Sequence, residues 1–143
     1  MTLSMAAGSS RPTGITLDES SYVPGVCNIG PAEIASRRRS GHVGVIASVV
    51  LLVVLIVIDA PSIARWLLIL PVAIAASGYL QAHLRFCAGF GALGEFNFGP
   101  RGNVEMVADR DARRRDRIKA VQIGLAGFGI GFVVAAVAVA LPV

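Results

Sequence analysis

The sequence predicts an all-α membrane protein with three transmembrane helices. Three stretches, residues 40–58, 66–84 and 120–143, contain no Asp, Glu, Lys or Arg. At ~1.5 Å rise per residue, helices of these lengths span about 28 to 36 Å, which is close to the hydrocarbon thickness of a bilayer. The composition agrees, because 55% of the residues are hydrophobic and the mean hydropathy is +0.70. A bilayer core offers no water to peptide groups, so such stretches are stable there only as helices.

The chain begins with a polar segment that precedes the first apolar stretch. Residues 1–21 are rich in Ser, Gly and Thr and have no apolar period, which predicts a flexible tail. Residues 22–40 predict a juxtamembrane turn and helix, with Pro31 at the first helical position and Glu33 in the first turn. We expect residues 40–41 to bend this helix into the membrane. No small-residue cleavage site follows the first apolar stretch, so we expect no cleaved signal peptide.

The first two transmembrane helices are expected at residues 41–59 and 66–84, joined by a short outer loop at 60–65. In this loop we expect Asp59 to cap a helix and Pro61 to begin the second helix. The loop is short, so the two helices should be antiparallel neighbours.

A longer loop at residues 85–119 connects the second helix to the third, which is expected at 120–143. The loop contains a glycine-rich turn and a basic segment. Two acid-first i, i+4 pairs precede the third span: Asp109 with Arg113, and Asp111 with Arg115. Such pairs are typical of a short solvated helix.

The distribution of basic residues predicts the orientation. Four basic residues precede the first span, eight lie in the 85–119 loop, and the connection at 60–65 has only Arg65. The positive-inside rule therefore places the N-terminus in the cytoplasm and the C-terminus outside, in a bacterial inner membrane. The arginines expected to set this orientation are Arg37, Arg38, Arg39, Arg113, Arg114 and Arg115.

Two function classes are disfavoured by the placement of charge. The net charge of +4 and pI near 9.8 would suit nucleic-acid binding, but the arginines abut the spans, where lipid headgroups explain them better. The spans contain no acidic or basic residue at mid-membrane depth, which counts against an ion-coupled transporter. The partner that the charges do indicate is the lipid bilayer.

A short pattern of Asn, an apolar residue, Gly and Pro occurs twice, both times just outside the membrane on the predicted cytoplasmic side. The two tetrads are Asn28-Ile29-Gly30-Pro31 and Asn97-Phe98-Gly99-Pro100. Each Asn can bond local backbone, Gly permits a positive φ, and Pro can begin the next element. The pattern fits either two similar turns, each followed by a helix start, or a two-part platform that binds a partner.

Glycines also form two patterns with known functional counterparts. Gly89, Gly91 and Gly94 have dinucleotide-binding spacing, but a membrane helix precedes them where such a site needs a strand, so we expect no nucleotide site. Gly127 and Gly131 form a Gly-x-x-x-Gly motif in the third span. Such a face packs helices closely in lipid, either onto this chain's own spans or onto another chain.

The chain has two cysteines and two histidines, all predicted near the cytoplasmic face: Cys27, His42, His83 and Cys87. Two thiolates and two imidazoles could bind a tetrahedral metal. Their spacing contains no Cys-x-x-Cys pair, and small buried cysteines with interfacial histidines are the alternative. We therefore expect no cofactor, and no disulfide in a reducing compartment.

The segment from Val26 to Ile34, ahead of an Arg run, carries the box C-N-I-G-P-A-E-I, and Arg85-Phe86-Cys87 and Asn97-Phe98-Gly99 follow the second span. With these residues the chain from Tyr22 onward resembles a group of uncharacterised small bacterial three-span membrane proteins. The resemblance implies the three-span fold and no activity.

These patterns favour an integral membrane protein that is a non-enzymatic accessory or assembly subunit of a membrane complex, in contact with other membrane subunits or with itself. Its candidate contacts are the two tetrads and the Gly127 face. One alternative is a metal, cofactor or redox module built on the four Cys and His residues. A further alternative is a small oligomeric channel or carrier.

Overall fold

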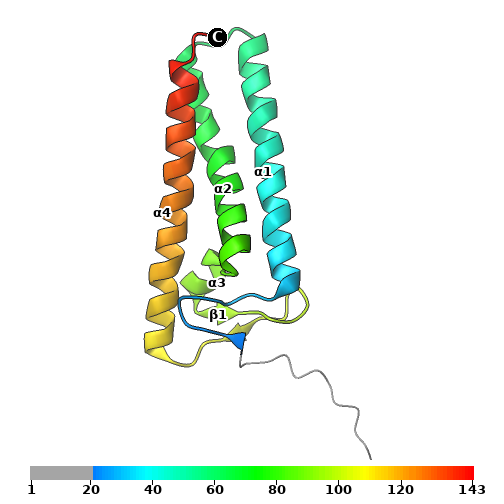
Figure 1. Ribbon diagram of the computed structural model, residues 1–143, viewed down its shortest axis with the longest axis vertical. Coiled ribbons are helices and arrows are strands. Elements are labelled where there is room, and N and C mark those ends of the chain that lie inside the picture. The colour runs from blue at the N-terminus through cyan, green and yellow to red at the C-terminus, as the bar shows by residue number, and fades with distance from the viewer. Residues whose placement is uncertain (1–20) are drawn as a thin grey trace, which may run out of the picture.

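The structure, a computed structural model, describes residues 21–143 (Figure 1). Three long helices stand side by side, and short elements cover one end of the bundle. Three helical segments are long and apolar enough to cross a membrane: Pro31–Val57, Ser62–Leu84 and Arg110–Ala140. The prediction of a mainly helical chain with three candidate spans is therefore confirmed. The tail predicted at residues 1–21 lies outside the described residues, apart from Ser21.

Helix α1 spans Pro31–Val57 as one unbroken helix. Pro31 occupies its first turn, as the sequence predicted, because the helix needs no N–H donor there. The bend expected at residues 40–41 is absent. Gly41 is instead a packing residue, since a Cβ built there would lie 3.0 Å from the Tyr79 ring.

The second span has two parts, the 3₁₀ helix η2 at Ser62–Leu68 and α2 at Ile69–Leu84. The expected position of Pro61 is wrong by one residue, and Asp59 does not cap this helix with its side chain. Asp59 adopts a left-handed conformation (φ 53°) after α1, and Pro61 lies at the N-cap of η2 rather than inside the helix. The turn thus reverses the chain through backbone conformation, with no side-chain cap on η2.

After α2 the chain forms α3 (Ala88–Leu93), β1 (Glu95–Phe96) and β2 (Glu105–Met106). The two strands pair antiparallel, with Glu95 opposite Met106, so the prediction of an all-α chain misses this small ribbon. Helix α4 then runs from Arg110 to Ala140 without interruption. The separate short helix expected before the third span is therefore the first part of α4.

Helix α2 lies between α1 and α4 and packs against both, whereas α1 and α4 have little direct contact. Glycines bring α1 close to α2. A Cβ built on Gly44 would lie 2.6 Å from the Ala75 nitrogen, and one on Gly78 would lie 2.6 Å from the Gly41 nitrogen. Only hydrogen fits at these positions, so the two backbones meet almost directly.

The Gly-x-x-x-Gly face of α4 packs on α2 in the same manner. Gly127 faces Ser77, and a Cβ built on Gly131 would lie 2.6 Å from the Ile69 carbonyl oxygen. Ala135 is fully buried one turn further on. The structure thus places this face inside the chain's own bundle, the first of the two uses that the sequence left open.

Candidate functional site: the cap and its basic pocket

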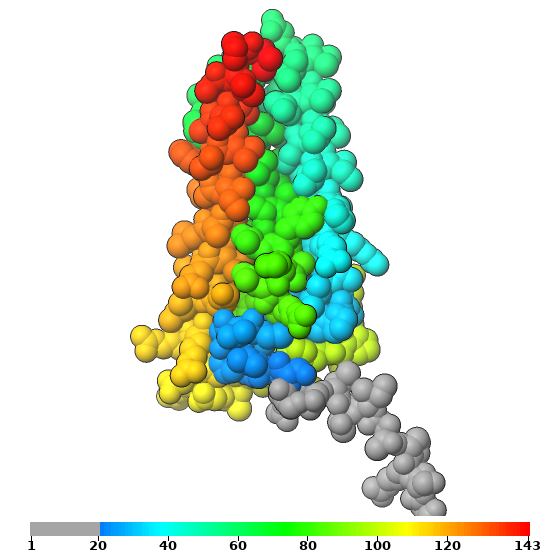
Figure 2. Space-filling model, in the orientation of Figure 1, coloured from blue at the N-terminus to red at the C-terminus, as the bar shows by residue number. Residues whose placement is uncertain are grey.

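Residues 21–30 and 85–109 form a compact layer at one end of the bundle, which we call the cap. Figure 2 shows residues 21–30, in blue, lying across the base of the long helices. The cap contains the second Asn-x-Gly-Pro tetrad, the first tetrad up to Gly30, and two of the four Cys and His residues, Cys27 and Cys87. Most of the candidate residues predicted from the sequence lie in or next to the cap, so their contacts there indicate their roles.

The two tetrads bind each other. Ile29 and Asn97 form a parallel bridge, in which the Asn97 N–H donates to the Asn28 carbonyl (2.9 Å) and the Gly30 N–H donates to the Asn97 carbonyl (2.8 Å). A Cβ on Gly30 would lie 2.8 Å from the Phe98 carbonyl oxygen, so only glycine permits this approach. The expectation that each tetrad begins a helix holds for Pro31 but not for Pro100, after which the chain continues as a loop to β2.

Asn28 joins the first tetrad to the end of the second span. Its side chain is fully buried and meets the backbone of Cys87 twice. The Cys87 N–H donates to Asn28 Oδ1 (2.7 Å), and Asn28 Nδ2 donates to the Cys87 carbonyl (3.1 Å). The expected local turn bond is therefore wrong for this residue, whose partner lies 59 positions away.

Asn97 makes the local turn expected of it and a longer bond as well. Its Oδ1 accepts from the Gly99 N–H (2.8 Å), and its Nδ2 donates to the Pro100 carbonyl (3.0 Å) and to Glu33 Oε1 (3.3 Å). Glu33 in turn pairs with Arg37 (3.8 Å). A buried carboxylate in the first turn of α1 thus fixes the second tetrad against that helix.

Asp116 is a buried carboxylate in the basic part of α4 that holds residues 21–30 in place. It is fully buried, and it accepts from the Tyr22 hydroxyl (2.6 Å) and the Gly25 N–H (2.7 Å). Burial of the phenol and its hydrogen bond to the carboxylate raise the pKa of Tyr22. Asp116 was not identified from the sequence as a buried residue, because its neighbours in the sequence are arginines. It nevertheless continues the buried stripe of α4 that contains Ala112, Ala120 and Ile123 at helical spacing.

The four Cys and His residues do not come together. His42 contacts the Tyr79 hydroxyl (2.6 Å), and Cys87 is buried at the start of α3, where its sulfur accepts from the Phe90 N–H (3.5 Å). Cys27 and His83 line one pocket. Within residues 21–143 no group of three or more His, Cys, Asp or Glu is placed to hold a metal.

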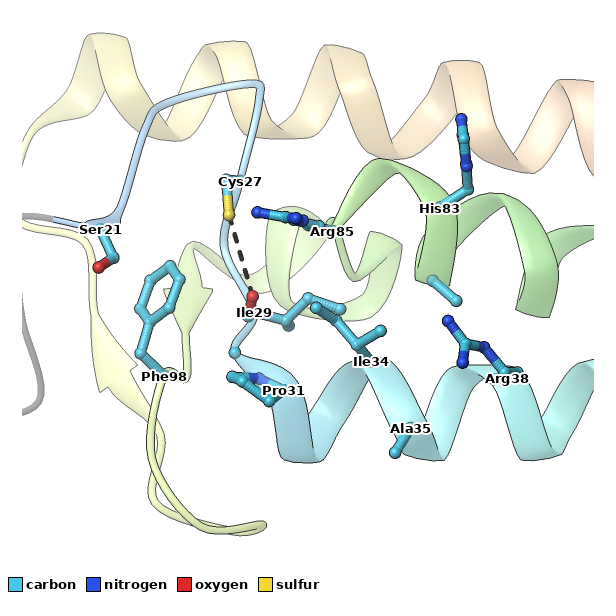
Figure 3. Close-up of a pocket in the computed structure, with 12 residues that line it drawn as sticks. Ser21, Cys27, Ile29, Pro31, Ile34, Ala35, Arg38, His83, Arg85 and Phe98 are labelled. Carbon is cyan, nitrogen blue, oxygen red and sulfur yellow. Dashed lines mark hydrogen bonds between the residues drawn. The ribbon is translucent and has the colours of Figure 1, made fainter.

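That pocket, which we call the basic pocket, has a volume of about 650 Å³. Residues 21–35, the end of α2 and the second tetrad surround it. Its polar lining includes Cys27, Arg38, His83 and Arg85, and no Asp or Glu is among the described residues that line it. Figure 3 shows Arg85 extending toward Cys27, and Arg38 rising from α1 toward α2.

The arginines predicted to set orientation have structural contacts as well. Arg37 lies 6.0 Å from the centre of the Phe90 ring and pairs with Glu33. Among the described residues this is the one ion pair within 4.0 Å, so the two Asp–Arg pairs expected before the third span are not formed. Asp109 instead caps α4, because its Oδ2 accepts from the Ala112 N–H (2.9 Å). Arg113 packs over Gly94, and the Cβ of Arg115 lies next to Gly25. Arg38, Arg39, Arg114 and Arg115 are exposed.

The dinucleotide spacing at Gly89, Gly91 and Gly94 serves packing. It lies in and just after α3, and a Cβ on Gly91 would lie 2.6 Å from the Phe86 ring. Gly94 has φ +74°, which ends α3 in a left-handed conformation. No strand precedes this segment in the described chain, as a dinucleotide fold requires.

The far end of the bundle has one buried cation that the sequence analysis assigned to a loop. Arg65 is 4% exposed, and its Nη1 donates to the carbonyls of Ala138 (2.8 Å) and Leu141 (2.9 Å). Its Nη2 donates to the Val143 carbonyl. A guanidinium thus satisfies the free carbonyls at the end of α4, a task that the sequence does not reveal because the partners are backbone groups.

Comparison with known protein families, with curated proteins and with solved structures gives no match to this chain.

Proposed function

We propose that this chain is a multi-pass protein of the bacterial inner membrane that acts as a non-enzymatic accessory or assembly subunit. Its N-terminus and cap would lie in the cytoplasm and its C-terminus outside. The support for this orientation is the asymmetry of the basic residues, since within residues 21–143 all but Arg65 lie on the cap side. Three apolar helices supply the membrane anchor.

The observation that carries the proposal is an apolar groove of about 410 Å³ on the cap. Its apolar lining includes Tyr22, Pro24, Phe96 and Met106, and Met106 is 64% exposed. The groove also reaches Ala112, which precedes the uncharged stretch of α4 by eight residues, or ~12 Å of helix. Lipid tails do not extend that far, so this apolar surface faces water unless protein covers it.

We assign the groove to an apolar segment of a partner membrane subunit. A flexible thioether at its edge adapts to different side chains, and the rigid hydrogen-bonded cap keeps the groove preformed. The polar groups of Asn28 and Asn97 are bonded within the cap, so at this groove the partner would be recognised through apolar contact.

Site-specific photo-crosslinking in native membranes tests this. A photoreactive residue at Met106 should give a discrete adduct with another membrane protein. The same residue at Val57, which is 77% exposed on the apolar part of α1, serves as the control and should label lipid. Adducts only with lipid, or only within the same chain, at Met106 would refute docking of a partner there; an adduct with a second copy would identify self-association.

A further inference from the structure

The basic pocket has features that the proposed function does not use. It gathers Arg38, His83 and Arg85 from two helices around a volume of about 650 Å³, which lies within the usual range for ligand sites. Within residues 21–143 neither arginine has a carboxylate within 4.0 Å. Both arginines are exposed, so their guanidinium donors are accessible to an anionic ligand.

Arg85 is an unusual residue for its backbone position. It ends α2 with φ 53° and ψ 36°, a left-handed conformation in which glycine is the common choice. The conformation is held because the Arg85 N–H donates to Gln81 and the Arg85 carbonyl accepts from the Asn28 N–H (3.2 Å). Strained non-glycine residues cluster at functional sites. Here the strain places a guanidinium in the pocket, beside Cys27 (Figure 3).

In the membrane placement proposed above, on which this inference rests, the pocket lies at the level of lipid headgroups. Arg38 precedes the first uncharged stretch by two residues, or ~3 Å of helix, and His83 lies in the last turn of α2. The remaining wall includes Ile34, Ala82 and Phe98, which suit the less polar part of a lipid. A soluble anion would need the charges but would gain nothing from these apolar side chains.

We propose that the basic pocket binds the phosphate group of an anionic phospholipid, with Arg38 and Arg85 as its cationic contacts. The bidentate geometry of guanidinium suits a phosphate diester. Free phosphate shares this chemistry, so the experiment separates the two sources.

The test is lipid binding by the full chain in neutral detergent, followed by native mass spectrometry. Phosphatidylglycerol should bind more tightly than phosphatidylcholine, and Arg38→Ala and Arg85→Gly should each weaken its binding about fivefold. Arg85→Gly retains the left-handed backbone and should leave the thermal midpoint unchanged or higher. Arg39→Ala is the matched control, because Arg39 is exposed at nearly the same depth on a different side of α1.

Protection of Cys27 from alkylation, in a Cys87→Ser chain, gives an independent measurement at the pocket. Phosphatidylglycerol should slow alkylation, and inorganic phosphate at equal concentration should not. If phosphate protects Cys27 as well as the lipid does, the lipid assignment is overturned in favour of a soluble anion. If Arg39→Ala weakens lipid binding as much as Arg38→Ala, the effect is general surface charge and the site does not exist.

Discussion

Replacing Asn28 with alanine should loosen the cap without unfolding the helices. The Asn28 carboxamide is the link between the first tetrad and the end of α2, through its two bonds with the Cys87 backbone. Alanine removes both bonds and leaves a small void at a position that is fully buried. The long helices pack through other residues, so the change should act on a local opening of the cap.

The size of the effect follows from the partners that remain. The Cys87 carbonyl also accepts from the Gly91 N–H (2.9 Å), so it keeps one bond. The Cys87 N–H loses its acceptor, and an unpaired buried donor costs about 1 to 3 kcal/mol. The second lost bond adds about 0.5 to 1.5 kcal/mol. The cap should therefore open more easily by about 2 to 4 kcal/mol, which corresponds to a roughly 30- to 1,000-fold larger open population.

Alkylation of Cys87 reports this opening directly, because the residue is 1% exposed in the closed cap. The measurement uses a Cys27→Ser chain in detergent, so that one thiol remains. When closing is faster than alkylation, the alkylation rate is proportional to the open population. Asn28→Ala should raise the rate by the factor above.

The matched control is Asn103→Ala, because Asn103 is exposed in the loop before β2 and makes no side-chain hydrogen bond among the described residues. Its alkylation rate should equal that of the parent chain. Equal rates for the Asn28 and Asn103 variants would show that the carboxamide does not hold the cap closed. The account of the cap as a preformed, rigid layer would then be incorrect.

Three further predictions concern the helices and the remaining buried polar groups. Gly44→Ala should lower the free energy of unfolding by about 1 to 3 kcal/mol, because the added methyl overpacks against α2, and the thermal midpoint in detergent should fall with it. Gly129→Ala is the control: nothing lies within 4 Å of a Cβ built at Gly129, so this change should be neutral or slightly stabilising. Arg65→Leu should speed hydrogen exchange in the last turn of α4 at least about tenfold, because each lost charge-assisted bond contributes about 1.5 kcal/mol or more. An unchanged exchange rate would contradict the capping role of Arg65. In a Tyr79→Phe chain, where Tyr22 is the sole tyrosine, ultraviolet absorbance should show that Tyr22 ionises above the ordinary pKa of about 10, and Asp116→Asn should lower that pKa. The Tyr22 contribution to stability is complete below about pH 10 and falls as the pH rises further.

The three spans could be predicted because their cause is local composition. The absence of charged residues can be read directly from the sequence. Pro31 is likewise a local signal, because proline is favoured in the first turn of a helix, and it marks the start of α1. The exact ends of the helices were harder to predict from the sequence. Asp59 ends up in a left-handed turn, and the basic segment before Ala120 fuses with the third span, because no helix-breaking residue separates them.

The cap could be located but not assembled from the sequence. The tetrads were recognisable as turns, yet their pairing depends on α1 beginning and α2 ending at the same end of the bundle, which is a property of the folded chain. The partner of Asn28 is a backbone group, and backbone groups are present at every position, so no sequence pattern indicates which one is used. Asp116 was accessible in principle, because it lies on the buried stripe of α4.

The cap compensates for a weakness in the helical bundle. Helices α1 and α4 lie on opposite sides of α2 and have little direct contact, so the spans alone would leave each outer helix held on one side. Residues 21–30 connect them, because Tyr22 and Gly25 bond to Asp116 on α4 and the same segment then leads into α1 at Pro31. The bonds of Asn28 fasten this connection to the end of α2, so all three helices meet in one hydrogen-bonded layer. A ligand in the basic pocket would contact this layer from both α1 and the end of α2, and its binding would therefore stabilise the arrangement of the helices as well as the cap.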